Sequence, residues 1–489
     1  MKNDRISRRG FLGTMAGISA LGAMPATGYS QELKKQTVPK PRLQDIKVSK
    51  PNGLNLIVLI ADTFRWDYLH FNGNERIKTP HLDKLAEQGT YFSNCYADGL
   101  PTIPARRVMH TGNSILPEKT KWVPLHDDDI TFPKILGKAG VTTGFIVDTY
   151  HHFKPGMNFH NGFDSFIWIR GQENDKYISG PRKSVNPTDF TPGHLFKNNR
   201  TFRDRIVQYV LNTNHRKGEG DYFCAQTLNT AAKWLANNKG NNGPFTLFVD
   251  MFDPHEPWDA PPRFQKMYRD KYPFERYIFG YGVKLEDIQK KDIPILIDLY
   301  SAEVTFMDYC IGQFIEKLKR LNLWDNTIIV FSTDHGTHLG EQGCVQKQAS
   351  LLNSCVARIP WIIRHPDKST IGKRIDAFTS HLDFMPTFLA LQGIEGYSAM
   401  DGHNIWPLVT GDKIEVRDKV IVGFTNYGAV RTKKWHYFQH VWGENPGHGP
   451  ALYDLENDYE EKYNIAAKHP EVVAEMKKIM REAFKKEIS

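Results

Sequence analysis

Acidic and imidazole side chains follow three hydrophobic segments of the chain. Asp62 follows LNLIVLIA, Asp334 and His335 follow IIVFST, and His255 follows FVDMFDP. Because the carboxyl ends of parallel strands meet at one edge of a sheet, these side chains could share a site. Two carboxylates and an imidazole suit a hard or borderline divalent ion such as Ca²⁺, Mg²⁺, Mn²⁺ or Zn²⁺. One such Asp alone more often caps a helix or closes a turn, so it is the combination that indicates a metal site.

A second group of residues lies in GLPTIPARRVMHTG, residues 99–112. Thr102, Pro104 and the following residues form a typical helix start, and a plain N-cap role is the alternative for Thr102. A helix N-terminus also offers amide groups and the positive end of its dipole to an oxyanion. Thr102 could then attack that anion while Arg106 binds it through two N–H groups, unless Arg106 is a surface residue.

The elements that must position these residues alternate between helix and strand. LNLIVLIAD reads as a central strand of a parallel sheet covered on both faces. Helix-then-strand patterns follow over residues 79–94, 131–148, 227–255 and 301–336. This alternation predicts an α/β/α sandwich with a mostly parallel sheet. From about residue 415 the pattern changes to short strands, one of them over 428–440, and a final polar helix, which predicts a small antiparallel sheet with one helix.

Composition narrows the class of protein. The chain has 489 residues, 40% of them hydrophobic, which is enough for a large core and a smaller companion domain. Its net charge of +8 comes without a long basic run, so we expect no nucleic-acid partner. The five cysteines show no metal-type spacing, and we expect most of them to be buried; a Cys344–Cys355 disulfide is an open alternative.

The N-terminus resembles a twin-arginine export signal, with Arg8 and Arg9 before a short apolar run. An anchoring helix is the alternative, although the run is short for a membrane span. We expect a signal peptide over 1–30, a linker over 31–52, a catalytic domain over 53–410 and a C-terminal subdomain over 411–489. The mature protein would be periplasmic or secreted, would need the twin-arginine (Tat) export machinery, and would not be bound to a membrane. The oligomeric state is open.

Four segments together resemble the sulfatase family of the alkaline phosphatase superfamily: residues 55–112, DPHEPW, LWDNTIIVFSTDHGTHLGEQG and ALYDLENDYEEKYNIA. They follow the family's order over nearly the whole mature chain. The resemblance implies an alkaline-phosphatase-like sandwich, a metal-dependent hydrolase, and an anionic small-molecule or glycan ester as substrate. Among divalent ions it favours Ca²⁺, with Mn²⁺ or Zn²⁺ as alternatives.

The resemblance also implies residue roles. Asp62, Asp334 and His335 fall on metal-ligand positions, and Thr102 falls on the nucleophile position, which also contacts the metal. Arg106 matches the arginine of the C/S-x-P-x-R motif. His255 and Lys347 match positions that bind the transferred group and the leaving oxygen, and His151 lies near another family histidine in an uncertain register. His338 and His381 are further candidates that we expect not to be ligands, and Tyr427, Arg431, Lys434 and Trp435 either reach the substrate or lie on strand surface.

Three departures from the family pattern bear on the chemistry. Thr63 replaces a second acid after Asp62, and DTYH replaces a Lys-Trp-His pattern, which puts Asp148 near the site. Thr102 stands where the family has a cysteine or serine that becomes formylglycine, and its β-methyl group prevents formation of that aldehyde. Related phosphodiesterases of the superfamily attack with a threonine, so the resemblance favours a phosphodiester or phosphonate ester. The alternatives are a sulfatase acting on a sulfated carbohydrate or aryl sulfate, and an anion-binding protein without catalysis.

Overall fold

The computed structural model describes residues 41–116, 121–153, 156–196, 199–241, 243–442 and 449–485. Arg8, Arg9 and the predicted signal peptide lie outside the described residues, as does the linker before residue 41. No helix in the described part of the chain is both long and apolar enough to span a bilayer.

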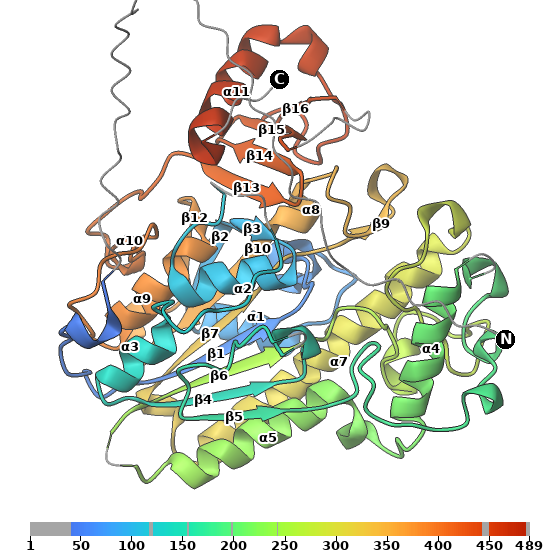
Figure 1. Ribbon diagram of the computed structural model, residues 1–489, viewed down its shortest axis with the longest axis horizontal. Helices are drawn as coiled ribbons and strands as arrows, with labels where there is room; N and C mark the ends of the chain where they lie inside the picture. The colour runs from blue at the N-terminus through green and yellow to red at the C-terminus, as the bar shows by residue number, and fades with distance from the viewer. Residues whose placement is uncertain are drawn as a thin grey trace, which may run out of the picture. The chain divides into compact units, whose positions relative to one another are not determined.

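The described residues form a nine-stranded sheet with the order β11-β2-β10-β7-β1-β6-β4-β5, and β12 beside β2 (Figure 1). Five neighbouring strands are parallel: β7 (Thr327–Thr333), β1 (Asn55–Ala61), β6 (Phe245–Met251), β4 (Thr142–Val147) and β5 (Ser165–Trp168). Beyond them, β10 (Arg358–Arg364) runs antiparallel to both β7 and β2 (Thr90–Tyr96), and β11 (Lys373–Ile375) and β12 (Thr379–Ser380) run parallel to β2. The fully buried, β-branched sequence of β1 suits this central place.

Helices cover both faces of this sheet. Ile57 and Leu59 of β1 share a core with α1 (Pro80–Glu87), α4 (Arg200–Thr213), α5 (Phe223–Asn238) and α7 (Ile293–Arg320). Val58 and Ile60 point the other way, into a core with α2 (Thr102–Thr111), α3 (Phe132–Lys138), α9 (Phe384–Leu391) and α10 (Trp406–Thr410). Alternate side chains of one strand therefore serve two cores, and the predicted three-layer α/β/α class is confirmed.

A smaller five-stranded sheet has the order β16-β15-β14-β13-β3 (Figure 1). Four strands come from the C-terminal part: β13 (Val420–Phe424), β14 (Tyr427–Arg431), β15 (Trp435–His440) and β16 (Ala451–Asp454), all antiparallel, with α11 (Pro470–Phe484) packed on them. The single strand predicted over 428–440 is wrong, because a turn in which Thr432 N donates to Trp435 O at 2.9 Å divides it into β14 and β15. The fifth strand, β3 (Gly99–Leu100), lies just before α2 and pairs in parallel with β13.

The remaining α-helices and strands are short. They are α6 (Pro262–Gln265), α8 (Ser354–Ala357) and a two-stranded sheet of β8 (His338–Leu339) and β9 (Val345–Gln346), and short 3-10 helices lie in the connections. All five cysteines are buried free thiols, so the structure contains no Cys344–Cys355 disulfide.

Candidate metal and catalytic centre

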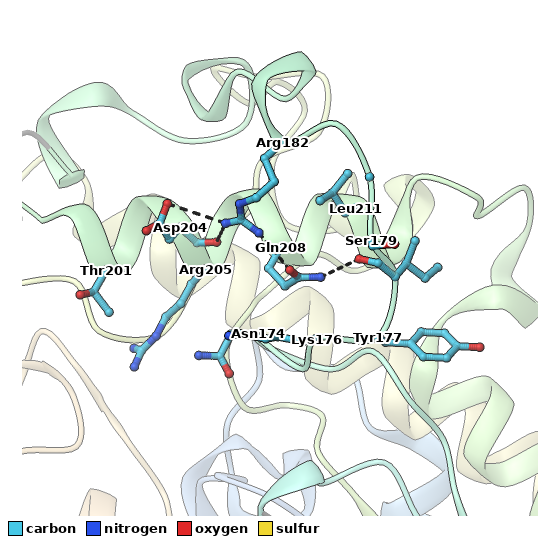
Figure 2. A pocket seen from close by; sticks show the side chains of 12 residues that line it. Asn174, Lys176, Tyr177, Ser179, Arg182, Thr201, Asp204, Arg205, Gln208 and Leu211 are labelled. Carbon is cyan, nitrogen blue, oxygen red and sulfur yellow. Dashed lines mark hydrogen bonds and ion pairs between the residues drawn. The ribbon is translucent and has the colours of Figure 1, made fainter.

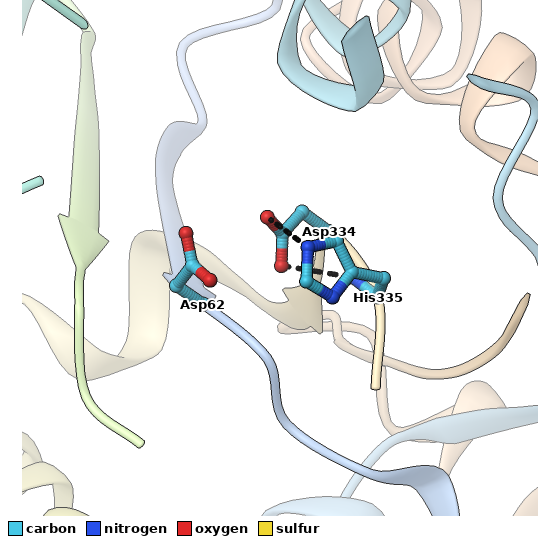
Figure 3. Close-up of side chains that lie close together, drawn as sticks. All are labelled: Asp62, Asp334 and His335. Carbon is cyan, nitrogen blue, oxygen red and sulfur yellow. Dashed lines mark hydrogen bonds and ion pairs between the residues drawn. The ribbon is translucent and has the colours of Figure 1, made fainter. Parts of the chain in front are cut away.

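Asp62, Asp334 and His335 lie together at the carboxyl ends of the neighbouring strands β1 and β7 (Figure 3). Each offers one ligand atom, and these atoms all lie within 4.8 Å of one another. All three side chains are buried; His335 Nε2 has no hydrogen-bond partner among the described residues, and Asp62 Oδ2 accepts no hydrogen bond but faces Arg106 Nη2 at 3.0 Å. A buried nitrogen lone pair without a partner is costly unless something binds it, so the donor set fits a divalent cation.

The protonation states suit that role. His335 Nδ1 lies 2.8 Å from the carbonyl oxygen of Gly336, which places the ring proton on Nδ1 and leaves Nε2 with a free lone pair. Burial lowers the pKa of His335 to about 4, although Asp334 opposes this, so the imidazole is neutral at neutral pH. Burial and the nearby Asp334 together raise the pKa of Asp62 well above its usual range. A cation between the two carboxylates would relieve that repulsion.

Thr63, which follows Asp62, orients both carboxylates. Its hydroxyl donates to Asp62 Oδ1 at 2.7 Å, and its backbone N–H donates to Asp334 Oδ1 at 2.9 Å. Thr63 has a φ of 64°, a left-handed conformation that is rare for a β-branched residue. Such conformations persist where surrounding contacts fix them, and they concentrate at functional sites.

Arg106 lies fully buried among three carboxylates. Its guanidinium donates through Nε and Nη2 to Asp250, each at 2.8 Å, and through Nη1 to Asp334, while Nη2 lies 3.0 Å from Asp62 Oδ2. Burial opposes the ionisation of Asp250, but Arg106 and His152 outweigh it and hold the pKa of Asp250 below its ordinary value. Asp250 is a site residue that the sequence analysis missed; an acid inside the apolar run FTLFVDM was the available signal.

Thr102 is the first residue of α2 and only 3% exposed. The N-cap is Pro101 and no side chain caps the helix, so an N-cap role does not account for this threonine. Its backbone oxygen accepts a hydrogen bond from Arg106 Nη1 at 3.3 Å, which links it to the carboxylate cluster one helical turn away. Its hydroxyl has no hydrogen-bond partner among the described residues, and its role as nucleophile and metal contact stays a prediction.

Lys347 and His255 form a close pair beside the cluster. Lys347 Nζ lies 2.7 Å from His255 Nε2 and 3.4 Å from the hydroxyl of Thr63. His255 Nδ1 lies 2.7 Å from Glu256 O, which places the ring proton on Nδ1 and makes Nε2 the acceptor from Lys347. Burial and the charge of Lys347 lower the pKa of His255 well below its usual value. The structure thus joins a charged lysine to a neutral histidine.

His151 lies farther from the cluster, beyond Phe252. Its ring is 5.8 Å from that of Phe252, which stacks on His255 at 4.2 Å, and His151 Nε2 is 3.2 Å from Glu173 Oε2. Asp148 accepts from the backbone N–H of Phe252 at 2.6 Å.

The other candidates make contacts outside the set of Asp62, Asp334 and His335. His338 Nδ1 is 2.9 Å from Gln346 O, and His381 Nε2 is 2.9 Å from Thr333 O. In the C-terminal sheet, Arg431 donates to Glu461 at 2.7 Å and Lys434 pairs with Glu456 at 3.2 Å. Tyr427 is buried in β14, and Trp435 lies beside the ring of His469.

Comparison with known proteins identifies the family. Residues 54–394 match the family model described as Sulfatase, and residues 340–486 match that of the N-sulphoglucosamine sulphohydrolase C-terminal region. A relative named N-acetylglucosamine-6-O-sulfatase, from Bacteroides thetaiotaomicron, is 25% identical, over 87% of this chain and 85% of its own length.

Solved structures show the same fold. A phosphonate monoester hydrolase of Agrobacterium radiobacter superposes with a TM-score of 0.69 at 19% identity, covering 88% of this chain and 96% of its own. A protein solved with its substrate D-glucosamine-2-N,6-O-disulfate gives a TM-score of 0.67 at 20% identity, covering 88% and 98%. Chains of this fold therefore include both sulfur and phosphorus ester enzymes.

Proposed function

The chain belongs to the sulfatase family, and we propose that within it this protein hydrolyses a phosphodiester or phosphonate ester with Thr102 as nucleophile. The observation that carries the proposal is the buried Thr102 at the start of α2, one turn before the arginine that lies among Asp62, Asp250 and Asp334. A helix N-terminus there favours an anion in front of the threonine hydroxyl.

Asp62, Asp334 and His335 would hold the divalent ion. The resemblance favours Ca²⁺, but an imidazole donor with two carboxylates is more typical of Mn²⁺ or Zn²⁺, and we propose one of these two ions. When bound, the ion would lower the pKa of a hydroxyl at the site and offset negative charge on the ester oxygens.

The chain's own residues account for the remaining steps. The Thr102 hydroxyl loses its proton to solvent, its Oγ forms a bond to phosphorus, and the bond from phosphorus to the leaving oxygen breaks. The Lys347–His255 pair supplies a proton to that oxygen, with Lys347 as the source because His255 is neutral. Water then attacks the phosphothreonine, and cleavage of the bond between phosphorus and Oγ restores the hydroxyl.

Arg106 acts chiefly as a positioning residue. Its donors are directed at Asp250 and Asp334, which fixes the Asp334 carboxylate and anchors the start of α2 through Thr102 O. This differs from the expected role of binding the anion directly through two N–H groups.

A sulfate ester on a carbohydrate is the second candidate. It is supported by the names of the relatives, which include an N-acetylglucosamine-6-O-sulfatase and an ulvan-active sulfatase. The weakness of this candidate is chemical: a sulfated threonine has no adjacent hydroxyl through which to expel sulfate, so each turnover needs a fresh attack by water at sulfur. A third candidate, an anion-binding protein without turnover, needs no buried Lys347–His255 pair. We also propose export through the twin-arginine route, on the strength of Arg8 and Arg9.

The test is a turnover panel with the metal-loaded protein and its Thr102→Ala and Thr102→Ser variants. The substrates are an aryl phosphodiester, an aryl phosphonate monoester, an aryl phosphomonoester and an aryl sulfate. We expect turnover of the first two substrates, and we expect Thr102→Ala to lower the rate at least about a thousandfold. With a ³²P-labelled phosphodiester, rapidly quenched samples should carry the label on Thr102. Equal rates in wild type and Thr102→Ala exclude the threonine nucleophile, and turnover of the sulfate alone favours the second candidate.

A further inference from the structure

A cavity of about 630 Å³ lies between the segment over residues 174–182 and helix α4 (Figure 2). Apolar atoms make up most of its exposed lining, but most of its lining residues are polar or charged and include Asn174, Lys176, Arg182, Asp204, Arg205 and Gln208. The volume is within the range of pockets that hold small organic ligands. The cavity is separate from the Asp62–Asp334–His335 cluster, since none of those three residues lines it.

The lining carries more positive than negative charge. Three of its residues, Lys176, Arg182 and Arg205, are basic, and Asp204 is its one acid. Arg182 accounts for that acid, because its Nη2 lies 3.7 Å from Asp204 Oδ1 while its Nη1 donates to Gln208 at 3.0 Å. Figure 2 shows Arg182 turned towards these two residues and Arg205 extending away from it. Among the described residues, Lys176 and Arg205 therefore have no ion-pair partner.

Of Lys176 and Arg205, Arg205 gives the stronger indication of an anion site. Its Nη1 donates to the carbonyl oxygen of Tyr281 at 2.9 Å, but its Nε is buried without a hydrogen-bond partner. Within the described part of the chain, no carboxylate lies within ion-pair distance of this guanidinium, although, against the opposing effect of burial, its charge helps to lower the pKa of the Glu173 carboxyl. An anion in the cavity would supply Arg205 with a direct ion-pair partner.

Tyr281 connects this arginine to the catalytic centre. The guanidinium carbon of Arg205 lies 5.1 Å from the centre of the Tyr281 ring, and Lys347 Nζ lies 5.2 Å from the same ring centre. The ring of His255 is 5.6 Å away. Arg205 and Lys347 thus contact the same tyrosine ring, which places the Arg205 end of the cavity beside the Lys347–His255 pair.

We propose that this cavity binds a second anionic group, a sulfate or carboxylate, on a saccharide substrate whose reacting ester lies at the metal centre. The inference rests on the proposed function for the reacting end, but it applies whether that ester contains phosphorus or sulfur. Lys176 and Arg205 bind the anion, and the amide nitrogen of Asn174, whose Oδ1 already accepts from Tyr150, offers donors to the sugar hydroxyls. The protein would therefore prefer an extended saccharide that carries more than one negative charge.

The test is calorimetric binding of a fully sulfated, heparin-derived tetrasaccharide to the full chain. Arg205→Gln and Lys176→Gln each remove one charge from the cavity lining, and Arg203→Gln, on the exposed side of the same helix, removes one charge outside the cavity. We expect each cavity variant to weaken binding by about tenfold or more, the worth of one charge-assisted hydrogen bond, and Arg203→Gln to change it less than twofold. Uncharged chitotetraose should not compete.

The outcomes separate this inference from the proposed chemistry. Binding is measured in wild type and in the Thr102→Ala background, so it does not depend on turnover. Equal affinities in Arg205→Gln and Arg203→Gln overturn the inference, as does a wild-type chain that does not bind the tetrasaccharide. An Arg205-dependent affinity for a tetranucleotide instead would overturn the saccharide assignment. Because Arg205 also contacts the backbone of Tyr281, Lys176→Gln and melting temperatures show whether a loss reflects the cavity or misfolding.

Discussion

Asp250 accepts two hydrogen bonds of 2.8 Å from the guanidinium of Arg106, and both side chains are fully buried. Asp250 also accepts from Thr149 Oγ1 at 3.0 Å and lies 3.2 Å from His152 Nε2. The carboxylate therefore joins β6, α2 and the segment after β4 at a single point beneath the candidate site.

Replacing this carboxylate should destabilise the fold. Asp250→Ala removes both 2.8 Å hydrogen bonds and leaves the buried Arg106 Nε without an acceptor, while Asp62 and Asp334 still face the guanidinium. A buried charged donor left without its acceptor costs about 3 kcal/mol of the free energy of unfolding. Urea unfolding measures it. Asp45→Ala, which removes one partner of the exposed Arg42–Asp45 pair, is the matched control and should have little effect. If the two variants unfold at the same urea concentration, the buried pair is not a structural requirement.

Metal binding should stabilise the protein and depend on His335. We expect Mn²⁺ or Zn²⁺ to raise the melting temperature more than Ca²⁺, with about 2.7 kcal/mol of added stability at a hundredfold excess over the Kd. His335→Ala should remove the preference for Mn²⁺ and Zn²⁺ over Ca²⁺, because only carboxylates remain. His126→Ala, at an exposed histidine, is the control variant. Equal shifts with all three ions in wild type would contradict an imidazole ligand.

The charge of Lys347 should affect the pKa of His255. Burial lowers the pKa of His255 first, and the Lys347 ammonium lowers it further. Lys347→Met should therefore raise that pKa, while burial still holds it below its ordinary value. The measurement is an NMR titration of the His255 ring protons, assigned with His255→Gln. An unchanged pKa means that the two side chains are not paired in solution.

Asp98 should make stability fall with rising pH. Burial raises its pKa from 3.8 to about 7, although Ser114 and the Ile115 N–H partly stabilise the ionised form. Between these two values the unfolded chain has released the proton and the folded chain still binds it, so each step up in pH costs stability until about pH 7.

Asp98→Asn removes this titration. The gain in unfolding free energy of the variant over wild type should grow from about pH 4 to pH 7 and then stay constant, at the order of 4 kcal/mol. Urea unfolding at pH 4.5, 6 and 7.5 gives the comparison. A difference that does not change with pH would show that Asp98 is ionised in the folded protein.

The sequence was sufficient to predict the residues whose positions follow from the pairing of neighbouring strands. Asp62 and Asp334 meet because β1 and β7 are adjacent and in register, with Ala61 opposite Thr333. The three-layer fold could be predicted from the alternation of helix and strand patterns, because that alternation places helices on both faces of a parallel sheet.

The features that were not predicted depend on the orientation of side chains within the site. Asp250 lies inside β6 rather than after it, at a place where only its pairing with Arg106 distinguishes it from any other strand residue. Thr63 looked like the loss of a ligand, yet its left-handed backbone lets it donate to both carboxylates. The Asp250–Arg106 pair and the contact of Thr63 with Asp334 do not follow from spacing, because each joins segments that are far apart in the chain.

The pairing of β3 with β13 makes the start of α2 depend on the C-terminal sheet. β3 lies just before the helix that begins with Thr102, and its partner strand follows far later in the chain. A chain cut before Val420 lacks that partner strand. Proteolytic removal of the C-terminal part would therefore take away a backbone support of the segment that carries Thr102.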